Sequence, residues 1–514
     1  MQAGSSLAVR AVLAIALMVL FYALAAAGVA ALAWIGLKLF ELLPSIRGRG
    51  FVMMGMIGAA CFAAAAVVIW SVLPRFDRFE PPGPEISEHE QPALFAEIRA
   101  IAAATGQQMP AHVYVVSEVN AFVAQRGGLM GFGSRRVMGV GTPLLRALQV
   151  DELRAVLAHE MGHFYGGDTR LGPWIYKTRG ALARTVVNLQ RVRASGDHWI
   201  MLLFAAVQAP FRWFLIGFLR ISQAISRAQE YSADAVAVRA EGQRALIDGL
   251  KKTHAAALAH SAYINGEVVP LVARGKLPAI GEGFSRFLAN ERLSKLLDEA
   301  VAHELEQGSG DPYDSHPPLR QRIEAAQAVE GPTRPADPRR AIELLRDAEA
   351  IEAADVTSRM EPRLEAIAWE DTAAEWAKIW REDVGAVAGA LEGIVLAEVP
   401  VDPKEIYARA VRAFGRERAN VGTDDELRAW WAQVVGQAIA LRLMDEGFSP
   451  MTGPGEPVRL VRGEAAGEEA DEEADEEAAE PFREVAKYLA GEETAEAWRA
   501  RWEARGLADR ALVR

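Results

Sequence analysis

Residues 151–163 read DELRAVLAHEMGH and contain two histidines, His159 and His163. The apolar side chains before the first histidine recur at helical spacing, which predicts a helix with one buried face and Asp151 as its N-cap. His159 and His163 are one turn apart, so both imidazoles project from the same face. Two imidazoles at this spacing can bind one zinc ion (Zn²⁺).

Glu160 follows the first histidine and can reach a water molecule on that ion. Zinc lowers the pKa of such a water towards about 7, and the glutamate then takes its proton. A catalytic zinc needs three protein ligands, and no further histidine follows His163 at a suitable spacing. We therefore expect the third ligand on another element.

Glu230, in the sequence RAQEYSAD, is the best candidate for that ligand. Asp234 lies one turn later, where it can accept the second ring N–H of a zinc-bound histidine. Arg227 is expected to anchor a nearby carboxylate. The alternative is a pair of solvated carboxylates on a surface helix, which is the better interpretation if the zinc helix is ignored.

The composition excludes several other kinds of protein. The 514 residues include one cysteine, Cys61, which rules out a disulfide framework and a zinc site made of several thiolates. The net charge of −12 argues against a nucleic-acid binder. Ten acids and no Lys or Arg lie in 463–480, and without them the chain is nearly neutral. We expect 463–480 to be an acidic low-complexity linker that contacts a partner protein.

The N-terminal part has the composition of a membrane anchor. Residues 11–37 and 51–73 are uncharged and long enough to cross a bilayer, which needs roughly 20 apolar residues. A cleaved signal peptide is the alternative for the first run, but the run is too long for one and a second span follows at once. Basic residues number three in the hinge and three in the outer flanks, so they do not decide the orientation. We expect a multi-pass protein of the cell (inner) membrane, in contact with the lipid bilayer, with its active site on the cytoplasmic side.

A third apolar stretch, 199–219, is interrupted by Pro210. His163 and Glu230 must meet at one metal ion, so an even number of membrane crossings separates them. Two full spans do not fit at roughly 20 residues each. The sequence therefore predicts no crossing, with the segment in the membrane interface or dipping into it as a hairpin broken at Pro210. A helix pair buried in the soluble core is equally permitted.

The fold class expected is mainly α with a small β-sheet (α+β): a transmembrane helical hairpin, a zincin-type HExxH domain and a helical C-terminal region. A helix is predicted at 92–105 and strands at 112–116, 120–125 and 135–140. The predicted domains are a membrane anchor (1–74), a metallopeptidase domain (75–330), a helical domain (331–462) with a tryptophan-rich core, the linker (463–480) and an amphipathic helical tail (481–514).

The segment 120–125 has two interpretations. It is an ordinary core strand, or it is an edge strand that pairs with an extended peptide substrate through backbone hydrogen bonds. The second interpretation makes Asn120, Ala121, Phe122 and Val123 substrate-binding residues, and it suits an enzyme that cuts unfolded segments.

These motifs carry a family resemblance over about 75–330, in the expected order: NAFV from Asn120, VGTPLL from Val140, the HEMGH helix, RAQEYSAD from Arg227, and SHPP from Ser315 with Arg320 and Arg322 after it. The chain resembles the HtpX-like heat-shock membrane proteases and the CAAX prenyl proteases, which are membrane zinc metallopeptidases. The resemblance implies a protein or peptide endopeptidase in which His159, His163 and Glu230 bind zinc and Glu160 is the base. Two clear spans fit the HtpX-like branch better than the many-span prenyl proteases.

His316 has two interpretations of equal weight. It is a turn histidine fixed by the following prolines, or it lies over the metal pocket and donates to the oxyanion of the tetrahedral intermediate. Tyr313, Asp314 and Tyr231 are competitors for that role.

The function expected is proteolytic quality control of membrane or misfolded proteins, which follows from the resemblance alone. One alternative is a protease that processes a single substrate, such as a prenylated or signal-like peptide. Another is a non-catalytic membrane scaffold with a structural metal, against which the intact Glu160 argues.

Overall fold

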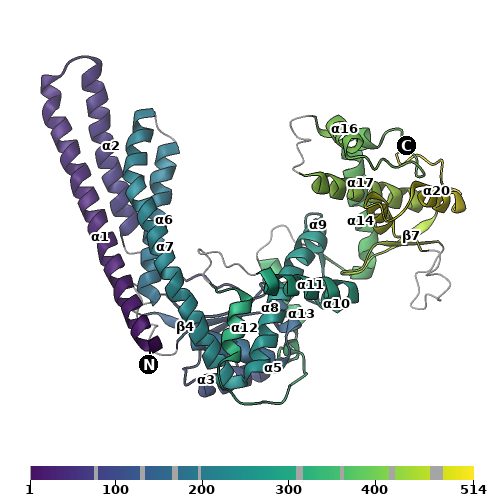
Figure 1. Cartoon of the computed structure of the whole chain (residues 1–514), viewed down its shortest axis with the longest axis horizontal. Helices are drawn as coiled ribbons and strands as arrows, with labels where there is room; N and C mark the ends of the chain where they lie inside the picture. Colours follow the sequence, from purple (N-terminus) through teal and green to yellow (C-terminus); the bar gives the residue numbers. More distant parts are fainter. Residues whose placement is uncertain are drawn as a thin grey trace. The chain divides into compact units, whose positions relative to one another are not determined.

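The computed structural model describes residues 2–73, 79–127, 133–164, 172–194, 198–307, 316–358, 364–415, 423–462 and 478–513 (Figure 1). The chain divides into two compact units: a first unit of Met1–Ala255 and Asp298–Asp347, and a second unit of Ala256–Leu297 and Ala348–Arg514. This division does not coincide with the predicted boundary at residue 330, because 256–297 pack with the second unit and 331–347 with the first. The described part of the chain is mainly helical with small sheets, which confirms the predicted fold class.

Two long apolar helices begin the first unit. They are α1 (Gln2–Leu42) and α2 (Arg49–Val72), joined through the short turn η1 (Leu43–Ser45). Both have the length and composition of membrane spans, as the predicted helical hairpin requires. Figure 1 shows α6 (Gly172–Ala194) and α7 (His198–Glu241) lying beside them. The shared interior consists of small side chains from α2 and aromatic ones from α1 and α7, among them Ala64, Ala65, Phe21, Phe204 and Phe211.

The segment around Pro210 differs from the prediction of a broken hairpin. Residues His198–Glu241 form one uninterrupted helix of 44 residues, and Met201–Arg220 is a third candidate span. A proline is tolerated within a membrane helix because neighbouring helices satisfy the backbone groups that it frees. An even number of crossings between His163 and Glu230 stays a prediction, and a crossing by α7 would require a second one by α6, which packs along α7. α6 is not itself a candidate span, and its basic residues, such as Arg184, lower its hydropathy.

Polar side chains of α6 bond within this bundle. Arg184 donates to the carbonyl of Ser71 at the end of α2 (3.2 and 3.3 Å), and Asn188 donates to the Ser71 hydroxyl (3.0 Å). Gln208 of α7 donates to the Val186 carbonyl (2.9 Å). These bonds satisfy polar groups that lipid could not, which allows a charged helix to pack beside the apolar ones.

Single cysteines in a Cys61→Ala background test the topology. His89, after α2, and Glu324, after α7, are both exposed and are expected on the same side of the membrane, whereas exposed Ser45 in the α1–α2 turn is expected on the other. An impermeant thiol reagent added to sealed vesicles should therefore label His89→Cys and Glu324→Cys alike, and Ser45→Cys only after permeabilisation, or the reverse. Opposite labelling of His89→Cys and Glu324→Cys would contradict an even number of crossings.

A four-stranded sheet with the order β1-β2-β4-β3 lies beside the HEMGH helix. Its strands are β1 (Glu85–Ile86), β2 (His112–Val116), β3 (Ala121–Arg126) and β4 (Arg135–Gly141). β2 and β4 are parallel, and the other pairs are antiparallel. The three predicted strands and the helix α3 (Pro92–Ala104) are confirmed. β3 lies at the edge of the sheet, and β4 leads into α4 (Thr142–Ala147) and then α5 (Val150–Gly162).

Later segments of the chain complete the first unit. α8 (Gln243–Tyr263) belongs to this unit up to Ala255, and α11 (Glu291–Gln307) belongs to it from Asp298. α12 (Leu319–Gln327) and η4 (Ala341–Leu344) lie wholly within it. Val301 of α11 and Leu319 and Ile323 of α12 form a small apolar cluster against α8.

The second unit contains the remaining elements: η3 (Ile264–Val268), α9 (Val269–Val272), β5 (Lys276–Pro278), α10 (Ile280–Ala289), α13 (Ala348–Ser358), β6 (Glu365–Ile367), η5 (Trp369–Asp371), α14 (Thr372–Ala386), α15 (Ala388–Leu391), α16 (Pro403–Phe414), α17 (Asp424–Asp445), β7 (Phe448–Met451), β8 (Arg459–Arg462), α19 (Pro481–Leu489) and α20 (Ala495–Ala504). Trp431, Trp498 and Trp502 are fully buried in its core. The predicted tail 481–514 therefore packs into this core, while most of the predicted acidic linker, 463–477, lies outside the described residues.

Candidate metal centre

Helix α5 begins two residues earlier than predicted. Its N-cap is Gln149, whose side chain and that of Glu152 form a reciprocal capping box, so Asp151 is not the cap. Asp151 lies in the first turn, where its charge suits the positive end of the helix dipole, and it pairs with Arg244 of α8.

The end of α5 packs closely on α7. A Cβ atom placed on Gly162 would lie 3.0 Å from the Ala233 Cα, so a larger residue would push the two helices apart by a few tenths of an ångström. Ala233 sits between Glu230 and Asp234. The close contact therefore brings these two carboxylates to the histidines of α5.

The residues predicted as ligands converge. The Nε2 atoms of His159 and His163 each lie 3.6 Å from an oxygen of Glu230, and the two rings meet edge to face with centroids 4.8 Å apart. Ligand atoms on a tetrahedral zinc ion are about 3.3 Å apart, given bonds of about 2.0 Å. Glu160 lies beside them, with Oε1 4.0 Å from the His159 Nε2 atom. His159, Glu160 and His163 together form a group that can bind a metal.

Asp234 fixes the orientation of His159. Its Oδ1 lies 2.8 Å from the His159 Nδ1 atom, so the ring donates there and directs its Nε2 lone pair towards Glu230. Arg322 of α12 donates to both oxygens of the same carboxylate, at 2.9 and 2.7 Å. Asp234 is almost wholly buried, and these bonds compensate its charge.

The protonation states are those a metal site needs. Burial raises the pKa of Glu160 to about 7, with the charge of His159 opposing and that of Glu230 adding to the shift. Burial, reinforced by the charge of His159, lowers the pKa of His163 to about 4, so its imidazole is neutral at pH 7. Burial alone would raise the pKa of Asp234, but hydrogen bonds from Arg322 and His159 outweigh it and give a pKa of about 2.

The surroundings of Glu230 indicate that His159, His163 and Glu230 together can bind a cation. Burial would raise its pKa, yet His316 and the charges of His159, Arg322 and His163 lower it, so the buried carboxylate is ionised. Its Oε2 atom is buried and has no hydrogen bond of good geometry among the described residues, although the His316 Nδ1 atom lies 3.0 Å away. A buried anionic oxygen without a donor is costly, and a metal ion bound by the two imidazoles and this carboxylate would compensate it.

The other predicted site residues lie around this centre. The ring of His316 is 61% exposed, so it reaches Glu230 from the solvent side. Tyr231 donates instead to Gln321 (3.1 Å), while Tyr313 and Asp314 lie outside the described residues. Asn120–Val123 lie at the start of the edge strand β3, which packs against α5.

Arg322 is the functional residue that sequence reasoning missed. Arg227, the predicted carboxylate anchor, is half-buried on α7, but the guanidinium that pairs with Asp234 is that of Arg322. Two arginines, Arg320 and Arg322, follow the His-Pro block, and their spacing alone does not tell which one faces inward. In the structure Arg320 is exposed and pairs with Glu324.

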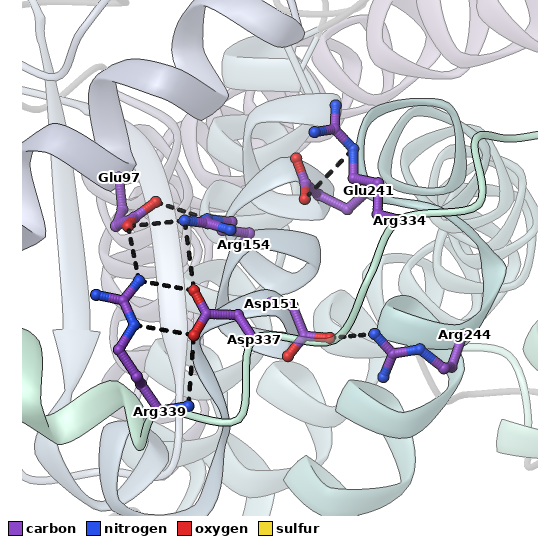
Figure 2. A network of polar contacts seen from close by, with 8 residues as sticks. All are labelled: Glu97, Asp151, Arg154, Glu241, Arg244, Arg334, Asp337 and Arg339. Carbon is purple, nitrogen blue, oxygen red and sulfur yellow. Dashed lines mark hydrogen bonds and ion pairs between the residues drawn. The ribbon is translucent and has the colours of Figure 1, made fainter.

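Figure 2 shows a second polar network, at the opposite end of α5 from the histidines. Arg154 of α5 donates to Glu97 of α3 (2.6 Å) and lies 3.8 Å from Asp337, which also pairs with Arg339 (2.6 Å). The adjoining backbone continues the contact, because the Val150 N–H donates to the Arg339 carbonyl (3.0 Å). The segment after residue 330 thus fixes the start of the HEMGH helix.

Replacing Arg322 should destabilise the metal-free protein. Arg322→Ala leaves Asp234 buried without its partner, which costs about 3–5 kcal/mol in free energy of unfolding. Arg320→Ala removes an exposed pair on the same helix and should cost less than about 1 kcal/mol. Denaturant unfolding of both variants in the presence of a chelator measures the difference, and equal losses would contradict the assigned role of Arg322.

Residues 88–330 match Peptidase family M48. Over 178 residues the chain is 32% identical to the protease HtpX homolog of Thermococcus kodakarensis, a match that covers 32% of this chain but only 58% of that relative. It is 24% identical over 312 residues to protease HtpX of Hahella chejuensis (57% of this chain, 92% of the relative) and 25% identical over 279 residues to protease HtpX of Mannheimia succiniciproducens (51% and 93%). No solved structure matches the chain significantly.

A paired-histidine helix and a set of apolar helices, together with a region that matches family M48, are the features of a membrane metallopeptidase. Over residues 88–330 the chain is similar to the HtpX-like membrane metallopeptidases. The resemblance seen in the sequence motifs is therefore confirmed.

Proposed function

We propose that this chain is a zinc-dependent endopeptidase that hydrolyses peptide bonds in extended protein segments at the membrane. The observation that carries the proposal is the convergence of His159, His163 and the buried carboxylate of Glu230, with Glu160 beside them. A purely structural metal site would not need Glu160. His159, His163 and Glu230 are the proposed ligands of one zinc ion per chain.

When bound, zinc would supply a Lewis acid next to the scissile carbonyl and acidify the attacking water. Glu160 accepts a proton from that water and passes it to the leaving amine. A carboxyl whose pKa lies at about 7 suits both steps, because it can accept and release a proton near neutral pH. Asp234 keeps His159 in one tautomer, and Arg322 keeps Asp234 in place.

The remaining predicted residues act on the substrate. The unpaired side of β3 offers backbone groups from Asn120 to Val123 to an extended peptide, which would bind with little dependence on sequence. His316 is mostly exposed and lies over Glu230, where it can donate to the oxyanion that develops on the scissile carbonyl.

The biological role that we infer is quality control of membrane or misfolded proteins. It is supported by the similarity to HtpX proteases and by the candidate spans of the first unit. The edge strand β3 adds support, because backbone pairing with a peptide depends little on the peptide's sequence. We place the protein in the cell (inner) membrane with its site on the cytoplasmic side, where proteins that fail to insert would be encountered.

A comparison of membrane proteomes tests this role. Cells expressing wild type or Glu160→Gln at equal levels should differ in many membrane and misfolded proteins, which accumulate with the inactive variant. Accumulation of a single precursor would instead identify a processing protease, and no difference between the two strains would contradict proteolysis altogether.

A further inference from the structure

The second unit contains a cavity of about 250 Å³ that is unrelated to the metal centre. It lies where η3, α14 and the segment between β7 and β8 meet α17 and α19. Its walls combine four aromatic rings and two carboxylates, namely Trp369, Trp376, Trp380, Phe482, Glu267 and Glu456. The Trp380 and Phe482 rings are tilted against each other, with centroids 5.6 Å apart.

The two carboxylates lack a direct cationic partner in the described part of the chain. Glu267 accepts a hydrogen bond from the Gly455 N–H (2.9 Å), which places it near the neighbouring Glu456. Among the described residues, neither acid forms an ion pair with Lys, Arg or His. Arg286, whose charge does reach Glu456, is paired with Glu370 (2.6 Å). Two acids face one cavity with nothing positive between them.

The backbone around the cavity is specialised. Glu267 sits in η3, a single π-helical turn at the end of α8, and such turns are rare and frequently found at functional sites. Gly455, which donates to Glu267, has a φ of 76° that favours glycine. Burial raises the pKa of Glu267 to about 7, with the Gly455 N–H opposing this shift and the charge of Glu456 adding to it.

We propose that this cavity binds a quaternary ammonium group. Aromatic faces attract organic cations, and rings from several directions form the cages that select methylated ammonium groups. Glu267 and Glu456 supply the compensating charge. The cavity lies below the usual 300–1,000 Å³ of small-molecule pockets, so it suits a small head group rather than a whole large ligand. This site is independent of the proposed proteolysis.

Calorimetric titration of the full-length chain in phosphatidylglycerol nanodiscs tests the proposal with choline as the probe. We expect saturable one-to-one binding of choline and none of 3,3-dimethylbutanol, its neutral analogue of the same shape. Repetition in phosphatidylcholine nanodiscs distinguishes two sources of the same chemistry. A lipid head group at the site would weaken the apparent binding of free choline, whereas a soluble ligand would leave it unchanged.

Two variants and a control connect the binding to the cavity. Trp376→Leu should weaken choline binding by about three- to thirtyfold, the range expected for a cation–π contact. Glu456→Gln should also weaken it, because it removes one of the two negative charges. Glu382→Gln, which removes an exposed partner of Arg274 in the same unit, should leave binding unchanged. Equal binding of the neutral analogue, absence of saturable heat, or an unchanged Kd in Glu456→Gln would overturn the proposal.

Discussion

Glu160→Gln is expected to leave the chain folded and loaded with metal, but to lower kcat/KM by about 10²–10⁴-fold. The amide is nearly isosteric with the carboxylate, yet it cannot accept the proton of the attacking water. The reason for expecting retained metal is geometric: the two imidazole Nε2 atoms and Glu230 converge on one point, and Glu160 is not one of the three.

The measurement pairs peptide hydrolysis with metal analysis on the same purified sample. Glu152→Gln is a suitable control, since Glu152 is a buried acid on the same helix that pairs with Lys252 away from the histidines. Its activity should be near that of wild type once it is folded. Full hydrolysis by a metal-replete Glu160→Gln protein would exclude Glu160 as the base.

Glu230→Ala should abolish activity by removing a metal ligand rather than a catalytic group. Asp234→Asn affects the ligand only through His159, so it should lower metal affinity by about 10–100-fold, and Glu230→Ala should lower it further. Glu241→Ala is the matched control, because Glu241 is a buried carboxylate of the same helix that pairs with Arg334 instead.

Competition with a chelator of known affinity measures the metal affinity of the three variants. We expect the affinity to be lowest in Glu230→Ala, intermediate in Asp234→Asn and near that of wild type in Glu241→Ala. Wild-type affinity in Glu230→Ala would mean that the third ligand is a different residue. Equal weakening in Glu241→Ala would show that the effect is a general disturbance of α7.

Much of the site was predictable because its chemistry is encoded at short range. The spacing of His159 and His163 fixes their relative orientation, and so does that of Glu230 and Asp234, since each pair lies on one helix. The contact between α5 and α7 depends on long-range packing. Gly162 is the residue of the HEMGH motif that packs closely on α7. Arg322 was missed for the same reason, because its partner lies 88 residues away.

The fold shows a similar division. The strands at 112–116 and 135–140 were predicted from their β-prone composition and from the glycines between them. The spans of α1 and α2 were predicted from length and apolar composition. The association of α6 with the bundle was not predictable, because its arginine and asparagine bond to Ser71 only in the packed structure. The parity of crossings stays a prediction, while the broken hairpin expected for the 199–219 segment was wrong, because His198–Glu241 is one helix.

The most direct measurement of the central claim is zinc titration of the chelator-stripped, full-length protein, with cleavage of a fluorogenic unfolded substrate as the readout. We predict that activity returns in proportion to zinc and reaches its plateau at one equivalent per chain. Glu160→Gln should bind the same equivalent without gaining activity. Full activity in the stripped protein, or a plateau that Glu160→Gln reaches as well as wild type, would contradict the account.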